Sequence, residues 1–291
     1  MEKQLHHLFF TAAKRAALRV AMRFSFNAPY YSLPKRLYSA AELVLGGILL
    51  LIVGSGLPAL MASPAHWAVA YGFYACISLL TLVFWPHGQL GWANRVTLAR
   101  AALVAVVAGG LVGNAFIAGL WQWLAIAVIA LALDGVDGWI ARRTQSHSAF
   151  GARFDMELDA LLIMLLCVGL LTLEPTLGAW VLIIGGMRYL FVAASGPLPW
   201  LRQPLFASFR RKAVCVWQVA ALLLALTPLT SSFATFLLAL SALITLAYSF
   251  GVDVWWLYKQ RLVDKATTSR ASPEGKPTNS DHVTPPTTGG R

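Results

Sequence analysis

The sequence DGVDGWIARRTQSHSAFGARFDMELD runs from Asp134 to Asp159 and is the most informative stretch of this chain. It lies between two apolar runs, residues 120–133 and 160–173, so four aspartates lie where two membrane helices reach the water boundary. A carboxylate near hydrocarbon costs about 2.5 kcal/mol or more, and acids in membrane segments are therefore functional candidates by default. The stretch predicts a helical membrane protein whose chemistry lies at one membrane face.

The spacing of the acids places them on two helical faces. Asp134 and Asp137 are three residues apart, and Asp155 and Asp159 are four apart, so each pair shares one face of its helix. If these faces meet, the four carboxylates repel one another unless cations neutralise them. Oxygen ligands suit hard ions, so we expect Mg²⁺ or Mn²⁺, with Ca²⁺ as an alternative. Two such ions would hold a phosphoryl group for in-line displacement.

Composition places the chain in the membrane class. It has 291 residues, of which 58% are apolar and 12% charged, which leaves no room for a large soluble domain. The net charge of +11 is distributed as expected for membrane orientation and anionic lipid headgroups, so we expect no nucleic-acid partner. The cysteines fall inside apolar runs without C-x-x-C spacing and predict neither disulfides nor a metal site. They are Cys76, Cys167 and Cys215.

Eight apolar runs are long enough to cross a bilayer core of roughly 30 Å. If the N-terminus is cytoplasmic, every Lys and Arg lies in or near a cytoplasmic segment, and the four outside turns contain none. This asymmetry predicts cytoplasmic termini and an active site at the cytoplasmic face, in what we expect to be a bacterial inner membrane. The runs are 39–62, 66–86, 96–114, 118–138, 152–173, 177–196, 213–229 and 232–256.

The chain divides into four segments. Residues 1–37 hold seven Lys or Arg among apolar residues, which predicts an interfacial amphipathic helix on the cytoplasmic leaflet, with a disordered basic tail as the alternative. Residues 38–90 hold two extra spans that look like a packing or docking addition, and residues 91–258 hold the other six. Residues 259–291, rich in Thr, Ser, Pro and Gly, predict a disordered cytoplasmic tail.

The pattern between Asp134 and Asp159 resembles the signature of the CDP-alcohol phosphatidyltransferases. This signature is D-x-x-D-G-x-x-A-R, eight residues, then G-x-x-x-D-x-x-x-D, and all eight fixed positions are present within 26 residues. The resemblance covers about residues 94–258, so these six spans would be the six-helix catalytic core of the family. It implies transfer of a phosphatidyl group from CDP-diacylglycerol to an alcohol, release of CMP, and a homodimer as in relatives.

The resemblance also implies roles for individual residues. Asp134, Asp137, Asp155 and Asp159 would surround two divalent ions, and Asp159 would be the base that accepts the acceptor's hydroxyl proton. The segment N-x-x-T-x-x-R before the signature would contact the nucleotide or the aspartates, although its residues would also serve as a helix cap, a backbone-bonded hydroxyl and a snorkelling arginine. The implied CDP-binding residues are Gly138, Ala141, Arg142, Gly151, Asn94, Thr97 and Arg100.

Three cations are candidates for binding a phosphate of the acceptor. Arg188 interrupts an apolar run, and because an unpaired buried guanidinium is costly, it should face the acidic cavity or bind an anion. Arg211 and Lys212 are also explained as a positive-inside cluster. Lys212 begins a segment similar to the K-x-x-T-x-x-Q of phosphatidylglycerophosphate-forming relatives, with Cys215 in place of Thr. Glycerol 3-phosphate or an inositol phosphate would suit these cations, and serine, choline or a phospholipid stay open.

Two other functions use the same residue types. Membrane prenyltransferases also bind Mg²⁺ through acids, but their two motifs lie in separate helical repeats, whereas only 17 residues separate Asp137 from Asp155. A cation transporter would have acids near the bilayer midplane and internal repeats, and the sequence shows neither. The spacing therefore favours the phosphatidyltransferase.

Overall fold

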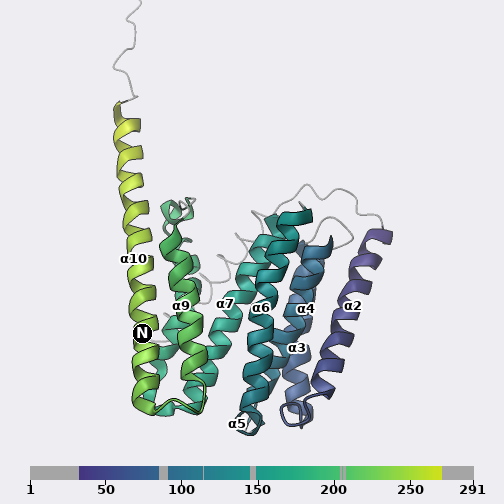
Figure 1. The fold of residues 1–291 in the computed structure, drawn as a ribbon. Coiled ribbons are helices and arrows are strands. Elements are labelled where there is room, and N and C mark those ends of the chain that lie inside the picture. Colours follow the sequence, from purple (N-terminus) through teal and green to yellow (C-terminus); the bar gives the residue numbers. More distant parts are fainter. Residues whose placement is uncertain are drawn as a thin grey trace, which may run out of the picture.

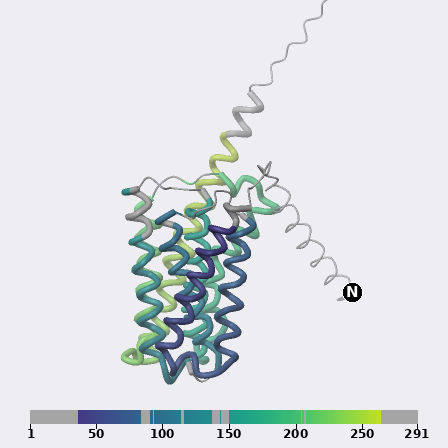
Figure 2. Tube along the Cα trace, turned by 90° about the vertical axis from the view of Figure 1, so that its right-hand side faces the viewer, coloured from purple at the N-terminus to yellow at the C-terminus, as the bar shows by residue number. Residues whose placement is uncertain are grey.

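The computed structural model describes residues 33–84, 91–113, 115–144, 149–203, 205 and 208–270. These residues form helices joined by short turns, with no strand among them. The long helices lie side by side and alternate in direction (Figures 1 and 2). The prediction of an all-α membrane fold is therefore confirmed. Most of the predicted amphipathic segment, residues 1–32, lies outside the described residues.

Each predicted apolar run overlaps a helix, although α2 (Leu33–Ser55) begins and ends six or seven residues before the run 39–62 does. Shorter 3-10 helices, labelled η, connect some of them. In chain order the elements are α2 (Leu33–Ser55), α3 (Pro64–Phe84), α4 (Gly91–Gly110), α5 (Ala115–Ala118), α6 (Leu120–Thr144), α7 (Ala149–Leu173), η1 (Pro175–Leu177), η2 (Ala179–Val181), α8 (Leu182–Ala194), η3 (Pro199–Arg202), α9 (Phe209–Ala225) and α10 (Ser232–Arg270).

Four of the described helices are long and apolar enough to cross a membrane, namely α2, α3, α7 and α10. Shorter apolar stretches cover Leu120–Val136 of α6 and Ala179–Ala194 of η2 and α8. Helix α4 differs because charged residues occupy its first half, and the apolar part of α6 ends just before Asp137. The expected count of eight spans therefore stays a prediction.

Helix α4 lies at the centre of its neighbours, in contact with α2, α3, α6 and α7. Its residues 101–108 are all buried, and they are Ala, Val and Leu. Small side chains let neighbouring helices approach closely. A helix that is apolar on all sides, as α4 is over these residues, is buried among its neighbours. The Trp123 indole of α6 also donates a hydrogen bond to the Val107 carbonyl at 2.8 Å. The second half of α4 is therefore covered by its neighbours and bonded to α6.

Helix α10 is much longer than a membrane span. Its 39 residues correspond to roughly 58 Å at the usual helical rise. It projects beyond the other helices at the end where α6 ends and α7 begins (Figure 1). Residues 259–270 are helical, although the composition of 259–291 predicts a disordered tail, because the first strong helix breaker in this segment is Pro273. Residues 271–291 lie outside the described chain.

Helices α7 and α8 cross at a glycine. A Cβ atom added at Gly185 would lie 2.7 Å from the backbone Cα of Met164, whereas one added at Gly186 would find its nearest neighbour, the end of the flexible Met164 side chain, at 3.8 Å. The crossing therefore requires glycine at 185 but not at 186.

We expect Gly185→Ala to separate α7 from α8 and to lower the free energy of unfolding by about 1–3 kcal/mol, as overpacking does. Gly186→Ala is the matched control, and its improved helix propensity should leave stability unchanged or raise it by up to about 1 kcal/mol. Thermal unfolding of the detergent-solubilised protein measures both. Equal melting temperatures for the two variants would contradict this description of the crossing.

Candidate metal and catalytic site

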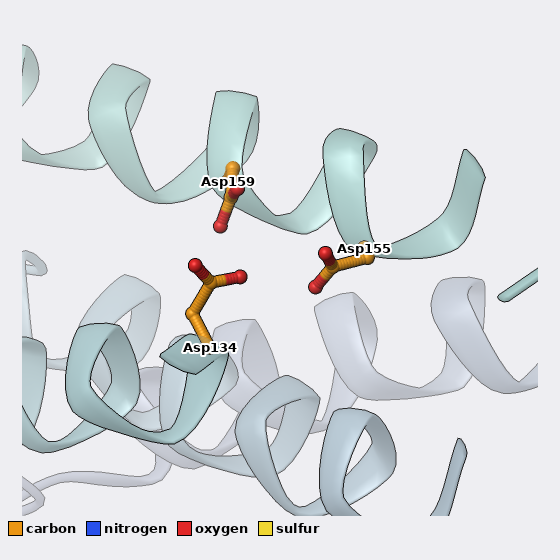
Figure 3. A group of neighbouring side chains, drawn as sticks. All are labelled: Asp134, Asp155 and Asp159. Carbon is orange, nitrogen blue, oxygen red and sulfur yellow. The ribbon is translucent and has the colours of Figure 1, made fainter. Parts of the chain in front are cut away.

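Three of the predicted aspartates converge from two helices (Figure 3). Asp134 lies on α6, and Asp155 and Asp159 lie one turn apart on α7. One oxygen from each carboxylate lies within 4.8 Å of the others. Their side chains keep between 33% and 38% of their surface exposed, so ions and water can reach them. Asp137 follows one turn later on α6, but its side chain lies outside the described residues.

A guanidinium from α4 holds these carboxylates together. Arg100 is completely buried, and its Nη1 donates to Asp134 Oδ1 at 2.8 Å. Nη1 also contacts Asp155, and Nη2 contacts Asp159. The sequence pattern predicted that Arg100 contacts either the nucleotide or the aspartates. In the structure its guanidinium contacts the aspartates. Arg100 thus joins three helices, α4, α6 and α7.

The described side chains fit a divalent cation. Three ionised carboxylates and one guanidinium leave two negative charges, which is the charge that one divalent ion neutralises. The donors are all carboxylate oxygens, which Mg²⁺ and Mn²⁺ prefer. Asp134, Asp155 and Asp159 are therefore the residues that would hold the ion.

The structure describes some of the predicted CDP-binding residues beside this cluster and leaves the side chains of others undescribed. Asn94 and Thr97 are buried and precede Arg100 at three-residue intervals on α4, so all three share one face. Gly151 lies one turn before Asp155 on α7. The remaining residues are in the last turns of α6, and their side chains lie outside the described residues. They are Gly138, Ala141 and Arg142.

Arg188 does not pair with the three aspartates. Its Nη2 lies 2.5 Å from Glu157 Oε1 of α7, and the expectation that it faces the acidic cavity is not supported by this contact. Glu157 is two residues from both Asp155 and Asp159, and side chains two residues apart on a helix point in directions about 200° apart. Glu157 and its partner Arg188 therefore lie at a different face of α7 from the aspartates. The buried Nε atom of Arg188 has no hydrogen-bond partner in the described part of the chain.

Arg211 lies near a buried acid that the sequence analysis missed. Asp253 of α10 keeps only 7% of its side-chain surface exposed, and its oxygens lie 2.5 Å from Arg210 Nη2 and 3.9 Å from Arg211 Nε. Lys212 is exposed at the same end of α9. The sequence does carry a signal for Asp253, because this acid lies inside the last apolar run, 232–256. An acid in a membrane segment is usually functional or paired.

Removal of the central cation should destabilise the cluster. We expect Arg100→Gln to lower the free energy of unfolding by roughly 3 kcal/mol in the presence of chelator, because three carboxylates lose their buried partner. Divalent ions should recover part of this loss because they neutralise the same oxygens. Lys259→Gln, a change of an exposed cation that contacts Trp255, is the control and should stay within about 0.5 kcal/mol. Equal unfolding curves for the two variants would contradict a central role for Arg100.

Comparison with known proteins assigns most of this assembly to one family. Residues 90–249, more than half of the chain, match the CDP-alcohol phosphatidyltransferase family. The match contains Arg100 and the three aspartates, whereas α2, α3 and Asp253 lie outside it. Searches of curated proteins and of solved structures found no match.

Proposed function

Because this chain belongs to the CDP-alcohol phosphatidyltransferase family, we propose that it transfers a phosphatidyl group from CDP-diacylglycerol to an alcohol and releases CMP. The observation that carries this proposal is the convergence of Asp134, Asp155 and Asp159 around Arg100. These residues occupy the acidic positions of the family signature at the required spacing. The matched region also contains the helices that bring them together.

In the proposed reaction, the acceptor's hydroxyl oxygen attacks the phosphorus that carries the diacylglycerol. A bond forms between these atoms, and the bond from this phosphorus to the oxygen bridging to CMP breaks, so CMP leaves with that oxygen. Asp159 accepts the hydroxyl proton. Divalent ions, when bound by the aspartates, supply charge neutralisation and polarise the phosphoryl oxygens. Asp137 would complete a set of four carboxylates for two ions, Mg²⁺ or Mn²⁺.

Arg100 acts on the carboxylates and not on the nucleotide in this proposal, since its guanidinium contacts all three described acids. It neutralises part of their charge and fixes Asp155 and Asp159 relative to Asp134. We assign contacts with CDP to Asn94 and Thr97, which are buried on the same face of α4. We assign the other contacts to Gly138, Ala141, Arg142 and Gly151, where small residues let a phosphate approach the backbone.

We propose that the acceptor is an alcohol that carries a phosphate. Arg188 pairs with Glu157, and Asp253 pairs closely with Arg210 and lies 3.9 Å from Arg211. The four cations Arg188, Arg210, Arg211 and Lys212 therefore exceed these two acids by two positive charges. A phosphate dianion would suit the remaining positive charge, as in glycerol 3-phosphate or an inositol phosphate. The distribution of Lys and Arg supports an active site at the cytoplasmic face of the membrane.

The proposed roles of the acids are tested by isosteric substitution. We expect Asp155→Asn and Asp159→Asn each to lower CMP release by at least about 100-fold, because one loses a metal ligand and the other a ligand and the base. Chelator should abolish CMP release by the unaltered protein, and Mg²⁺ or Mn²⁺ should restore it. Both variants should still insert into the membrane. Full activity of purified Asp159→Asn protein would remove Asp159 as the base.

The acceptor class is tested by assay of the purified protein with labelled CDP-diacylglycerol against phosphorylated and unphosphorylated alcohols. We expect Lys212→Gln to raise KM for the phosphorylated acceptor about tenfold, as loss of a charged contact to phosphate does. KM for CDP-diacylglycerol should be unchanged and serves as the internal control. Faster turnover with serine or choline than with any phosphorylated alcohol would contradict this acceptor class.

A further inference from the structure

The two helices outside the family match contact the helix that carries Arg100. Both α2 and α3 pack against α4, and they join each other through the turn at residues 56–63 to form a hairpin. The family match begins at residue 90, so this hairpin is an addition to the matched region. The sequence alone indicated only packing or docking for it.

At the end of α4 near the aspartates, the contact is an ion pair. Glu42 Oε1 of α2 accepts hydrogen bonds from Arg95 Nε at 3.0 Å and Arg95 Nη2 at 2.6 Å. The Glu42 side chain is only 12% exposed, and the Arg95 guanidinium also lies over the Trp92 ring at 4.9 Å. Such partly buried, charge-assisted bonds fix orientation better than an exposed pair does. Arg95 lies beside Asn94 and only five residues before Arg100.

One turn further along α2, three helices meet without space for a side chain. A Cβ atom at Gly46 would lie 2.1 Å from the Tyr74 hydroxyl of α3 and 3.1 Å from Leu98 of α4. The same hydroxyl donates a hydrogen bond to the Leu43 carbonyl at 2.6 Å. Tyr74 therefore locks α3 to α2 at the level where α2 meets α4.

At the opposite end, a histidine of α3 fixes the end of α4. The Ser63 backbone N–H donates to His66 Nδ1 at 3.1 Å, so the ring proton is on Nε2, which donates to the Val112 carbonyl at 2.9 Å. A Cβ atom at Gly109 would lie 2.7 Å from the His66 carbonyl oxygen, so the backbones touch here. The hairpin thus contacts α4 near its start, at Arg95 and Leu98, and again at its end, at Gly109 and at Val112 just beyond it.

These contacts oppose sliding and rotation of α4, and such movements would displace Arg100 from the aspartates. We propose that the α2–α3 hairpin fixes the position of α4 and that Glu42 is a positioning residue for the Arg100–aspartate cluster. Displacement of a catalytic group by about 1 Å is enough to lower activity by up to 100-fold. The inference deepens the proposed function and rests on it for its activity measurement, whereas metal affinity tests it separately.

The experiment uses the full-length protein with Glu42→Gln, Arg95→Gln and the charge-reversed pair Glu42→Arg with Arg95→Glu. Glu174→Gln is the matched control, since Glu174 accepts a hydrogen bond from Ser232 at 3.1 Å at the other end of α7. Three quantities are measured for each protein: the melting temperature, kcat and KM for CMP release, and Kd for Mn²⁺ by electron paramagnetic resonance. The melting temperature identifies any variant that fails to fold.

We expect Glu42→Gln and Arg95→Gln each to lower kcat and to raise Kd for Mn²⁺ by roughly tenfold, as outer-shell changes do at metal sites. The effect should fall on kcat more than on KM, because alignment and not substrate binding is lost. The charge-reversed pair should recover most of both quantities, and Glu174→Gln should match the unaltered protein.

Unchanged kcat and unchanged Mn²⁺ affinity in both single variants would overturn the inference, as would a charge-reversed pair no better than Glu42→Gln. If the unaltered protein binds Mn²⁺ but releases no CMP, the proposed function fails while the Mn²⁺ affinities still decide the role of Glu42.

Discussion

The contact between one buried guanidinium and three carboxylates constrains the whole arrangement. Arg100 is fully buried, and its partners Asp134, Asp155 and Asp159 come from two other helices. Charges in such a place are costly unless they are paired, so α4, α6 and α7 must adopt one mutual register. The same register gathers the oxygens that a divalent ion requires. Stability of the bundle and chemistry of the site therefore depend on the same four side chains.

Packing around α4 and ion pairs between other helices support this arrangement of α4, α6 and α7. Helix α4 is made of small apolar residues where its neighbours cover it and carries polar residues where it meets the aspartates. Among the described residues, three further close ion pairs connect helices on the same side of the bundle. The opposite side is held by apolar packing, by hydrogen bonds to backbone carbonyls and by the hydrogen bond from Ser232 to Glu174. The pairs are Arg95 with Glu42, Arg188 with Glu157, and Arg210 with Asp253. Polar contacts thus concentrate around the cluster.

Apolar runs predicted the helical membrane fold. The spacing of the acids predicted the convergence of Asp134, Asp155 and Asp159, because helical periodicity determines which acids share a face. It did not predict which helices are neighbours, since periodicity describes one helix at a time. The partner of Glu42 and the burial of Asp253 depend on that arrangement and were missed. The extension of α10 to Arg270 was missed because composition was averaged across a tail whose first helix breaker is Pro273.

The proposed metal site is tested most directly by anomalous X-ray diffraction from crystals of the protein grown with Mn²⁺. If these side chains hold a divalent ion, an anomalous peak is expected among the carboxylates of Asp134, Asp155 and Asp159, with Arg100 still in contact with at least one of them. Peaks only at other positions, or carboxylates that point apart into solvent with no ion between them, would contradict the proposed site.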